Sequence, residues 1–257
     1  MSKSGTKEWC TESRSIFIGC KNNCNYCWAR ANYCKRYKRM PVADWPQMRL
    51  NKEAFNEKPY LIEGRIMYPG THDIFLETLP ETVSYLRPWL KLGNNILITT
   101  KPRFNVITLL CDALQDYKNQ ITFRFTIGSM HDEILNVWEP DAPKYRERML
   151  CLEHAKTQGY QTSASIEPYL DGDVIPLAES MLPLITDSIW IGKMREVDFR
   201  VETSWFDEEG MDVYNKLLEL LSDEFVEHIY RHFKNNPKIH YKDSIKKVIG
   251  LPEEPIG

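Results

Sequence analysis

The chain lacks the features that mark membrane and disulfide-stapled secreted proteins. Its 257 residues contain no apolar run of about 18 residues, the length needed to cross a membrane as a helix. The segment Met1 to Glu8 lacks the apolar stretch of a secretory signal peptide. Cysteine is scarce, and its seven copies are odd in number and unevenly spread, unlike a disulfide framework. We therefore expect a soluble, cytoplasmic protein with no membrane association.

Positive charge is also in short supply, except at one end. The formal net charge is −3, yet residues 1–40 carry nine Lys or Arg against two acids, which leaves −10 for the remainder. These cations either offset an anionic cofactor and contact solvent, or form a phosphate-facing patch beside an active site. A pI near 6.1 favours the first interpretation and argues against strong non-specific binding of nucleic acid.

Three of the few cysteines stand together in one loop. Cys20, Cys24 and Cys27 follow an apolar, strand-like run and are spaced four and then three residues apart. Closed zinc sites and ferredoxin clusters use four protein ligands, so three thiolates indicate a metal centre with one coordination position open. The alternative is a closed, structural zinc site with Cys10 or Cys34 as its fourth ligand.

The residue before the third cysteine is aromatic, Tyr26. The pattern Cys20-x-x-x-Cys24-x-Tyr26-Cys27 after a first strand resembles the signature of the radical S-adenosylmethionine (SAM) superfamily. The resemblance implies that the three cysteines hold a 4Fe-4S cluster, that its fourth iron binds SAM, and that Tyr26 lies near the adenine. It also implies a reducing partner of the flavodoxin or ferredoxin type.

Strand-like and helical segments alternate along the rest of the chain. Six such units predict an α/β fold in which parallel strands form a partial (β/α)6 barrel, as the resemblance also implies. Residues 1–203 are expected to form this barrel core, and 204–257 a C-terminal helical cap of the same domain. The expected strands are 14–18, 65–68, 95–100, 121–127, 161–166 and 188–191. The expected helices are 28–39, one short helix within 41–58, 80–91, 104–117, 144–157, 174–184, 210–221, 224–234 and 241–248.

Residues that follow the strands are the candidates for ligand binding, because parallel barrels bind ligands at the carboxyl ends of their strands. After the second strand comes Pro69-Gly70-Thr71-His72-Asp73, at the position of the family's SAM-binding glycine motif. Its Thr-x-Asp character resembles the spore photoproduct lyase group. Gly70 and Thr71 would offer backbone to SAM and Asp73 would pair with an ammonium. Alternatively, Gly70 takes positive φ in a turn and Asp73 caps the next helix.

The later strands end in further polar residues. After the third strand, Lys101 would neutralise the SAM carboxylate or a substrate phosphate, or contact solvent. Ser129 follows the fourth strand and would bond SAM. Within that strand, an inward Arg124 would need an anionic partner.

The fifth and sixth strands add two more candidate groups. Alternation along the fifth strand places Ser163, Ser165 and Glu167 on one face, where Ser165 and Glu167 would bond ribose or orient substrate. After the sixth strand, Gly192 would make room for adenine or substrate, beside the cations Lys193 and Arg195.

The sequence therefore predicts a radical SAM enzyme that acts on a nucleobase, nucleotide or nucleic acid. A peptide or small metabolite is the alternative substrate. From another class of protein, a zinc-stapled binding module without catalysis remains open.

Overall fold

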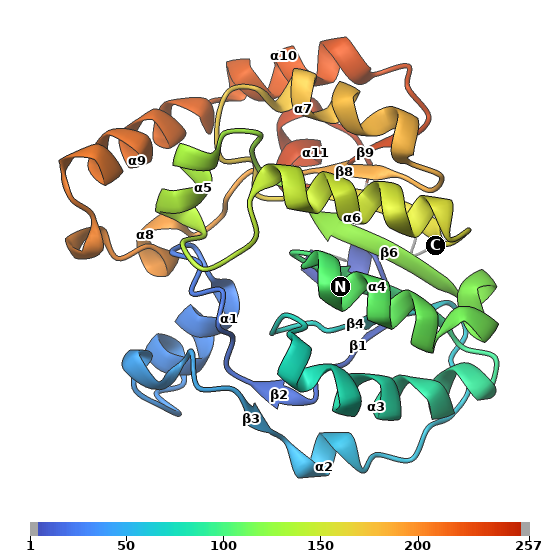
Figure 1. The fold of residues 1–257 in the computed structure, drawn as a ribbon. Coiled ribbons are helices and arrows are strands. Elements are labelled where there is room, and N and C mark those ends of the chain that lie inside the picture. Colours follow the sequence, from blue (N-terminus) through green and yellow to red (C-terminus); the bar gives the residue numbers. More distant parts are fainter. Residues whose placement is uncertain (1–4, 253–257) are drawn as a thin grey trace.

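The structure, a computed structural model that describes residues 5–252, is built on one parallel sheet (Figure 1). Its strands follow the order β1-β4-β5-β6-β7-β8-β9, and each neighbouring pair is parallel. The sheet curls into a half-barrel, which confirms the expected partial α/β barrel. The strands are β1 (Glu12–Ser13), β4 (Arg65–Tyr68), β5 (Asn95–Thr100), β6 (Ile121–Thr126), β7 (Gln161–Ile166), β8 (Ile189–Ile191) and β9 (Ile239–Tyr241).

Helices that connect successive strands cover the outer face of the sheet (Figure 1). Each of these helices forms because it has an apolar stripe to bury. In the helix Phe104–Ala113, for example, Val106, Ile107 and Leu110 lie in the core. None of the described helices has both the length and the apolar composition to cross a bilayer. The connecting helices are α3 (Leu79–Lys91), α4 (Phe104–Ala113), α6 (Tyr145–Thr157) and α7 (Val174–Met181).

Two helices are missing from the sequence prediction, α5 (Asp132–Trp138) and α8 (Val197–Arg200). Each is too short to show a helical period in its apolar residues. The predicted helix 28–39 exists in two parts, α1 (Trp28–Arg30) and a π-helical segment, Ala31–Arg36. The short helix expected within 41–58 is α2 (Lys52–Phe55).

The first predicted strand, 14–18, is wrong as a single element. β1 pairs with β4, whereas β2 (Phe17–Ile18) leaves the main sheet and pairs antiparallel with β3 (Arg49–Leu50). Ser15 breaks the strand because its hydroxyl accepts hydrogen bonds from the backbone N–H groups of Gly70 and Thr71, both at 3.0 Å. The chain therefore bends and carries the cysteine loop over the carboxyl end of the sheet.

The C-terminal part contains a strand that the sequence analysis takes for a helix start. α9 (Glu208–Leu220) and α10 (Asp223–Phe233) match the expected helices, but Tyr241 ends β9. Three residues are too few to reveal strand alternation. α11 (Asp243–Ile249) follows. Since β9 pairs with β8, this region adds a seventh strand to the sheet; the division at residue 203 stays a prediction.

The segment before β1 occupies the open side of the half-barrel. There a 3₁₀ turn, Gly5–Glu8, meets Lys242, which directly follows β9. The Lys242 ammonium lies 2.6 Å from the Glu8 carboxylate and 2.5 Å from the carbonyl oxygen of Gly5. Trp9 then packs edge-on against Trp190 of β8, with ring centroids 6.1 Å apart. The N-terminal turn thus bridges from one edge strand of the sheet toward the other.

Candidate metal centre

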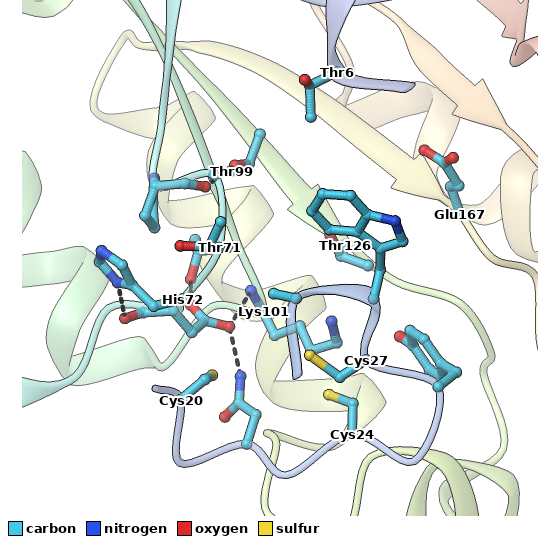
Figure 2. A pocket seen from close by; sticks show the side chains of 18 of the residues that line it. Thr6, Cys20, Cys24, Cys27, Thr71, His72, Thr99, Lys101, Thr126 and Glu167 are labelled. Carbon is cyan, nitrogen blue, oxygen red and sulfur yellow. Dashed lines mark hydrogen bonds between the residues drawn. The ribbon is translucent and has the colours of Figure 1, made fainter. Parts of the chain in front are cut away.

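A cavity of about 280 Å³ opens at the carboxyl ends of the strands (Figure 2). Its walls are the cysteine loop and segments that end or follow β4, β5, β6 and β7, which is where ligand-binding residues are expected. Most of the predicted site residues line it: Cys20, Cys24, Tyr26, Cys27, Gly70, Thr71, Asp73, Lys101 and Glu167. Ser129, Ser165 and Gly192 are not part of its lining.

The cysteine side chains point into this cavity (Figure 2). Cys20 and Cys24 are buried and Cys27 is half-buried. The loop begins at Gly19, whose φ of 96° lies in a region that favours glycine. A Cβ there would lie 2.5 Å from the carbonyl oxygen of Trp45, so glycine alone permits this approach. The same oxygen accepts a hydrogen bond of 3.0 Å from the backbone N–H of Cys20.

The middle of the loop is held by α5. The backbone N–H of Asn25 donates to the carbonyl of Trp138 at 2.8 Å, and the Asn25 side-chain amide donates to that of Val137 at 2.6 Å. The last turn of a helix leaves its carbonyl groups unpaired, so it can accept these bonds. A helix that the sequence analysis missed therefore positions the candidate ligands.

The spacing of the sulfur atoms suits a group larger than one metal ion. Within residues 5–252, one set of three His, Cys, Asp or Glu has all its ligand atoms within 4.8 Å of one another; it is His131, Asp171 and Asp173. The sulfurs of the loop cysteines are thus spread more widely. A tetrahedral zinc with bonds of about 2.3 Å would hold sulfurs about 3.8 Å apart. At least one pair of the loop sulfurs is therefore farther apart than a single zinc ion would hold it.

The cysteines considered as fourth zinc ligands lie outside the cavity lining. Cys10 packs against Met67 and Leu97, whereas Cys34 packs in one apolar cluster with Cys20 and Cys27, with its sulfur 3.9 Å from the carbonyl oxygen of Pro41. Burial raises the pKa of the Cys24 thiol to about 12. Because metal ligands are thiolates, a bound cation is needed to keep this sulfur charged at neutral pH.

Asp73 ties the cysteine loop to the sheet. Its carboxylate accepts hydrogen bonds from the side chains of Asn22 and Thr100 and from the backbone N–H groups of Ile74, at 2.8 Å, and Lys101, at 3.0 Å. A carboxylate has about four acceptor positions, so all are occupied. Asp73 therefore joins the loop to the end of β5 instead of capping the next helix, which begins at Leu76.

A buried ionic cluster lies behind the cysteines. The Glu139 carboxylate accepts hydrogen bonds from the Tyr26 hydroxyl and the Arg148 guanidinium. The Lys101 ammonium lies 3.6 Å from the same carboxylate and 5.5 Å from the centre of the Tyr26 ring. Sequence reasoning missed Glu139 and Arg148, because nothing local in the sequence brings them to the loop.

The charges of Glu139, Arg148 and Lys101 stabilise one another. Burial alone would raise the pKa of Glu139, but Arg148 and Lys101 hold it below its usual value. Burial alone would lower the pKa of Lys101, but the Cys24 sulfur, as a thiolate, and the Glu139 carboxylate raise it well above its usual value. Both groups are therefore charged at neutral pH, and Lys101 places a fixed positive charge beside Cys24.

Gly70, Gly192 and Ser129 each contact other parts of the chain. Gly70 does not take positive φ; a Cβ there would lie 2.1 Å from the Ser13 hydroxyl. At Gly192 a Cβ would lie within 3 Å of the side chains of Lys242 and Glu167. The Ser129 hydroxyl accepts a 2.9 Å bond from the backbone of the nearby His131. Each of these residues thus has a packing or hydrogen-bonding role within the chain, and its contact with SAM stays a prediction.

The cations expected at the barrel mouth are paired within the chain. Arg124 does face inward, and its partners are Ser163 at 2.9 Å and Asp187 at 3.4 Å. Lys193 pairs with Asp223 at 3.5 Å, and Arg195 pairs with Asp243 at 2.6 Å. With Lys101 bound to Glu139, these four residues do not form an open phosphate-facing patch.

A curated protein is similar to the chain at the sequence level. The chain is 29% identical over 163 residues to the uncharacterized protein ORF301 of Acidianus two-tailed virus, a match that covers 59% of this chain. The matched region spans about half of that protein, 53%. No protein-family model matches the chain.

The fold has solved counterparts. The structure of spore photoproduct lyase complexed with dinucleoside spore photoproduct matches 89% of this chain and 75% of that chain, with a TM-score of 0.53 and 15% identity. Mutants of the same enzyme match with the same TM-score at 13 to 15% identity. In its fold, the chain is thus similar to a radical SAM enzyme, as the cysteine motif indicated.

Proposed function

We propose that this protein is a radical SAM enzyme whose 4Fe-4S cluster is held by Cys20, Cys24 and Cys27. The observation that carries the proposal is three thiols that point into one cavity at the carboxyl ends of a parallel half-barrel. Among residues 5–252 no fourth cysteine lines that cavity. When bound, the cluster and SAM supply a 5′-deoxyadenosyl radical that abstracts hydrogen from a substrate.

Residues of the chain itself would bind SAM and orient it. Lys101 supplies a positive charge for the SAM carboxylate, and Glu139 holds it in place. Tyr26, whose hydroxyl is committed to Glu139, offers its ring to the adenine. The buried walls around the cysteines exclude water, which protects a reactive radical from side reactions. Such a cluster needs a reducing compartment, so we expect the cytoplasm and a flavodoxin- or ferredoxin-type electron donor.

As substrate we propose a nucleobase-containing molecule. Support comes from the fold likeness to an enzyme solved with a dinucleoside. The pairing of Lys193 and Arg195 within the chain speaks against a site that depends on phosphate contacts. A peptide or small metabolite is the alternative substrate.

The test is anaerobic reconstitution with iron and sulfide, then incubation with SAM and dithionite. We expect brown protein with about four irons per chain and formation of 5′-deoxyadenosine. Colourless protein that retains one zinc and forms no 5′-deoxyadenosine would instead support the zinc-stapled binding module.

A further inference from the structure

Positive charge gathers in the segment that directly follows the cysteine loop. Residues 28–40 contain five Lys or Arg and no acidic residue. Lys35 and Arg36 pair with glutamates of another segment, at 3.4 and 3.1 Å. Lys38 and Arg39 are exposed, and neither makes an ion pair within the part of the chain that the structure describes. The charge at these two positions is therefore available to a partner.

Aromatic side chains connect this charge to the cysteines. The Arg39 guanidinium lies 5.5 Å from the centre of the Tyr33 ring and 5.3 Å from that of the Tyr37 ring. Tyr37 is 59% exposed. Tyr33 and Cys27 both pack against the apolar cluster that contains Cys20. Packed side chains therefore lead from the exposed charge to two of the three candidate cluster ligands.

The size of this charged surface argues against a nucleic acid as its partner. Binding that rests on phosphates uses many contacts, about 6 to 10 in a strongly salt-dependent case. The exposed cations of the segment are Arg36, Lys38 and Arg39, and the first of them is paired with Glu196. A transient complex between redox proteins needs only a small interface, in which opposite charges orient the two partners.

We propose that Tyr37, Lys38 and Arg39 form the surface on which an acidic electron-donor protein docks. The donor would lose one electron and the cluster would gain it, and no bond forms or breaks in that step. Lys38 and Arg39 attract acidic side chains of the donor, and Tyr37 adds the aromatic contact that is common in protein interfaces. These three residues are not part of the cavity lining, so donor and substrate can bind together. This inference rests on the proposed function, for which it names the surface that the reducing partner uses.

The first measurement is equilibrium binding of an acidic flavodoxin and of an acidic ferredoxin to the reconstituted protein at low ionic strength. Lys38→Glu and Arg39→Glu should each weaken binding of at least one donor about 3- to 10-fold, because each replaces attraction by repulsion. The double variant should weaken it about 10- to 100-fold. Added salt should weaken binding to the unaltered protein more than binding to the double variant, since salt screens exposed charges.

The second measurement separates docking from chemistry. With a limiting amount of the same donor as sole reductant, the double variant should form 5′-deoxyadenosine about 10- to 100-fold more slowly than the unaltered protein. With dithionite, which needs no docking surface, the two proteins should agree within about twofold. Lys91→Glu is the matched control and should change neither result, because Lys91 is also exposed but ends α3 at the amino edge of the sheet.

Several results would overturn the docking surface. One is donor binding that the double variant leaves unchanged; another is unaltered protein that binds neither donor yet forms 5′-deoxyadenosine with dithionite. An equal loss of activity with dithionite would show that the substitutions damage the cluster site. A single-stranded oligonucleotide that binds the unaltered protein but not the double variant, while donor binding persists in both, would assign the surface to nucleic acid. Absence of 5′-deoxyadenosine from unaltered protein with dithionite would instead refute the proposed function.

Discussion

The two walls of the cavity are built in opposite ways. On the cysteine side, the Asp73 and Glu139 carboxylates accept hydrogen bonds from several groups of the chain, and Glu139 also pairs with the Lys101 ammonium at 3.6 Å. On the opposite side, the Nε of Arg200 has no hydrogen-bond partner within the described residues, and neither has the hydroxyl of Ser165, which lies in β7 outside the cavity lining. The acceptors of the first wall are therefore occupied within the chain, whereas part of the second wall keeps hydrogen-bonding capacity.

The largest loss of activity is expected from a substitution of a cysteine in the loop. Cys24→Ala removes one of three thiolates and should abolish cluster assembly and formation of 5′-deoxyadenosine while the half-barrel remains folded. Cys111→Ala is the matched control, because Cys111 is also a buried cysteine but lies in α4 and does not line the cavity. Iron content and circular dichroism measure the two properties. Equal iron content in both variants would contradict the assignment of Cys24 as a ligand.

The next largest effect, on the free energy of unfolding, is expected for the ionic cluster of Glu139, Arg148 and Lys101. Glu139→Gln leaves Arg148 and Lys101 without their shared buried carboxylate, and should lower the free energy of unfolding by about 3–5 kcal/mol. Glu133→Gln, at a carboxylate that is 68% exposed, should change it by less than about 0.5 kcal/mol. Urea denaturation compares them. If Glu139→Gln costs less than about 1 kcal/mol, the first wall does not depend on this cluster.

His72 is the exception on the first wall, since its Nε2 has no hydrogen-bond partner within the described residues. Burial lowers the pKa of His72 to about 4. Between pH 6.5 and 4 the unfolded chain binds a proton that the folded chain does not, so stability falls as the pH falls through this window. The loss should reach about 3 kcal/mol at pH 4. A His72→Leu variant should lack this part of the pH dependence in urea denaturation; an unchanged profile would show that His72 is protonated without penalty.

The smallest effects are expected for two buried serines of β7, Ser163 and Ser165, whose alanine variants can be compared directly. Ser163→Ala should cost about 1–3 kcal/mol, because the Ser163 hydroxyl accepts from Arg124 at 2.9 Å and donates to the carbonyl of Ser188 at 2.6 Å. Ser165→Ala removes a hydroxyl that has no hydrogen-bond partner among residues 5–252, and should be neutral or stabilise by up to about 1 kcal/mol. Thermal and urea unfolding measure both variants. Equal destabilisation would mean that Ser165 is already satisfied.

Much of the half-barrel can be predicted from the sequence because its signals are local. β4, β5 and β7 have the predicted bounds, since each is a strand-like run between clear breaks. β1 and β9 could not be predicted: two or three residues show no period, and sheet neighbours alone define them. The cysteine motif could be placed at the carboxyl end of the sheet, because it directly follows a strand-like run in the sequence.

The partners of the site were beyond sequence reasoning. Glu139 reaches Tyr26 across 113 positions, and Asp73 reaches Asn22 across 51. Such contacts depend on how strands and loops are arranged in space, which no local pattern specifies. For the same reason, Lys101 could be expected at a strand end, but its pairing with a buried carboxylate could not.

The most direct test of the central claim is the electron paramagnetic resonance spectrum of the reduced, reconstituted protein before and after addition of SAM. A cluster held by three cysteines has one iron free to bind SAM, so we predict that the spectrum changes. A cluster signal that SAM leaves unaltered would contradict the account, because the fourth iron would then be closed to the cofactor.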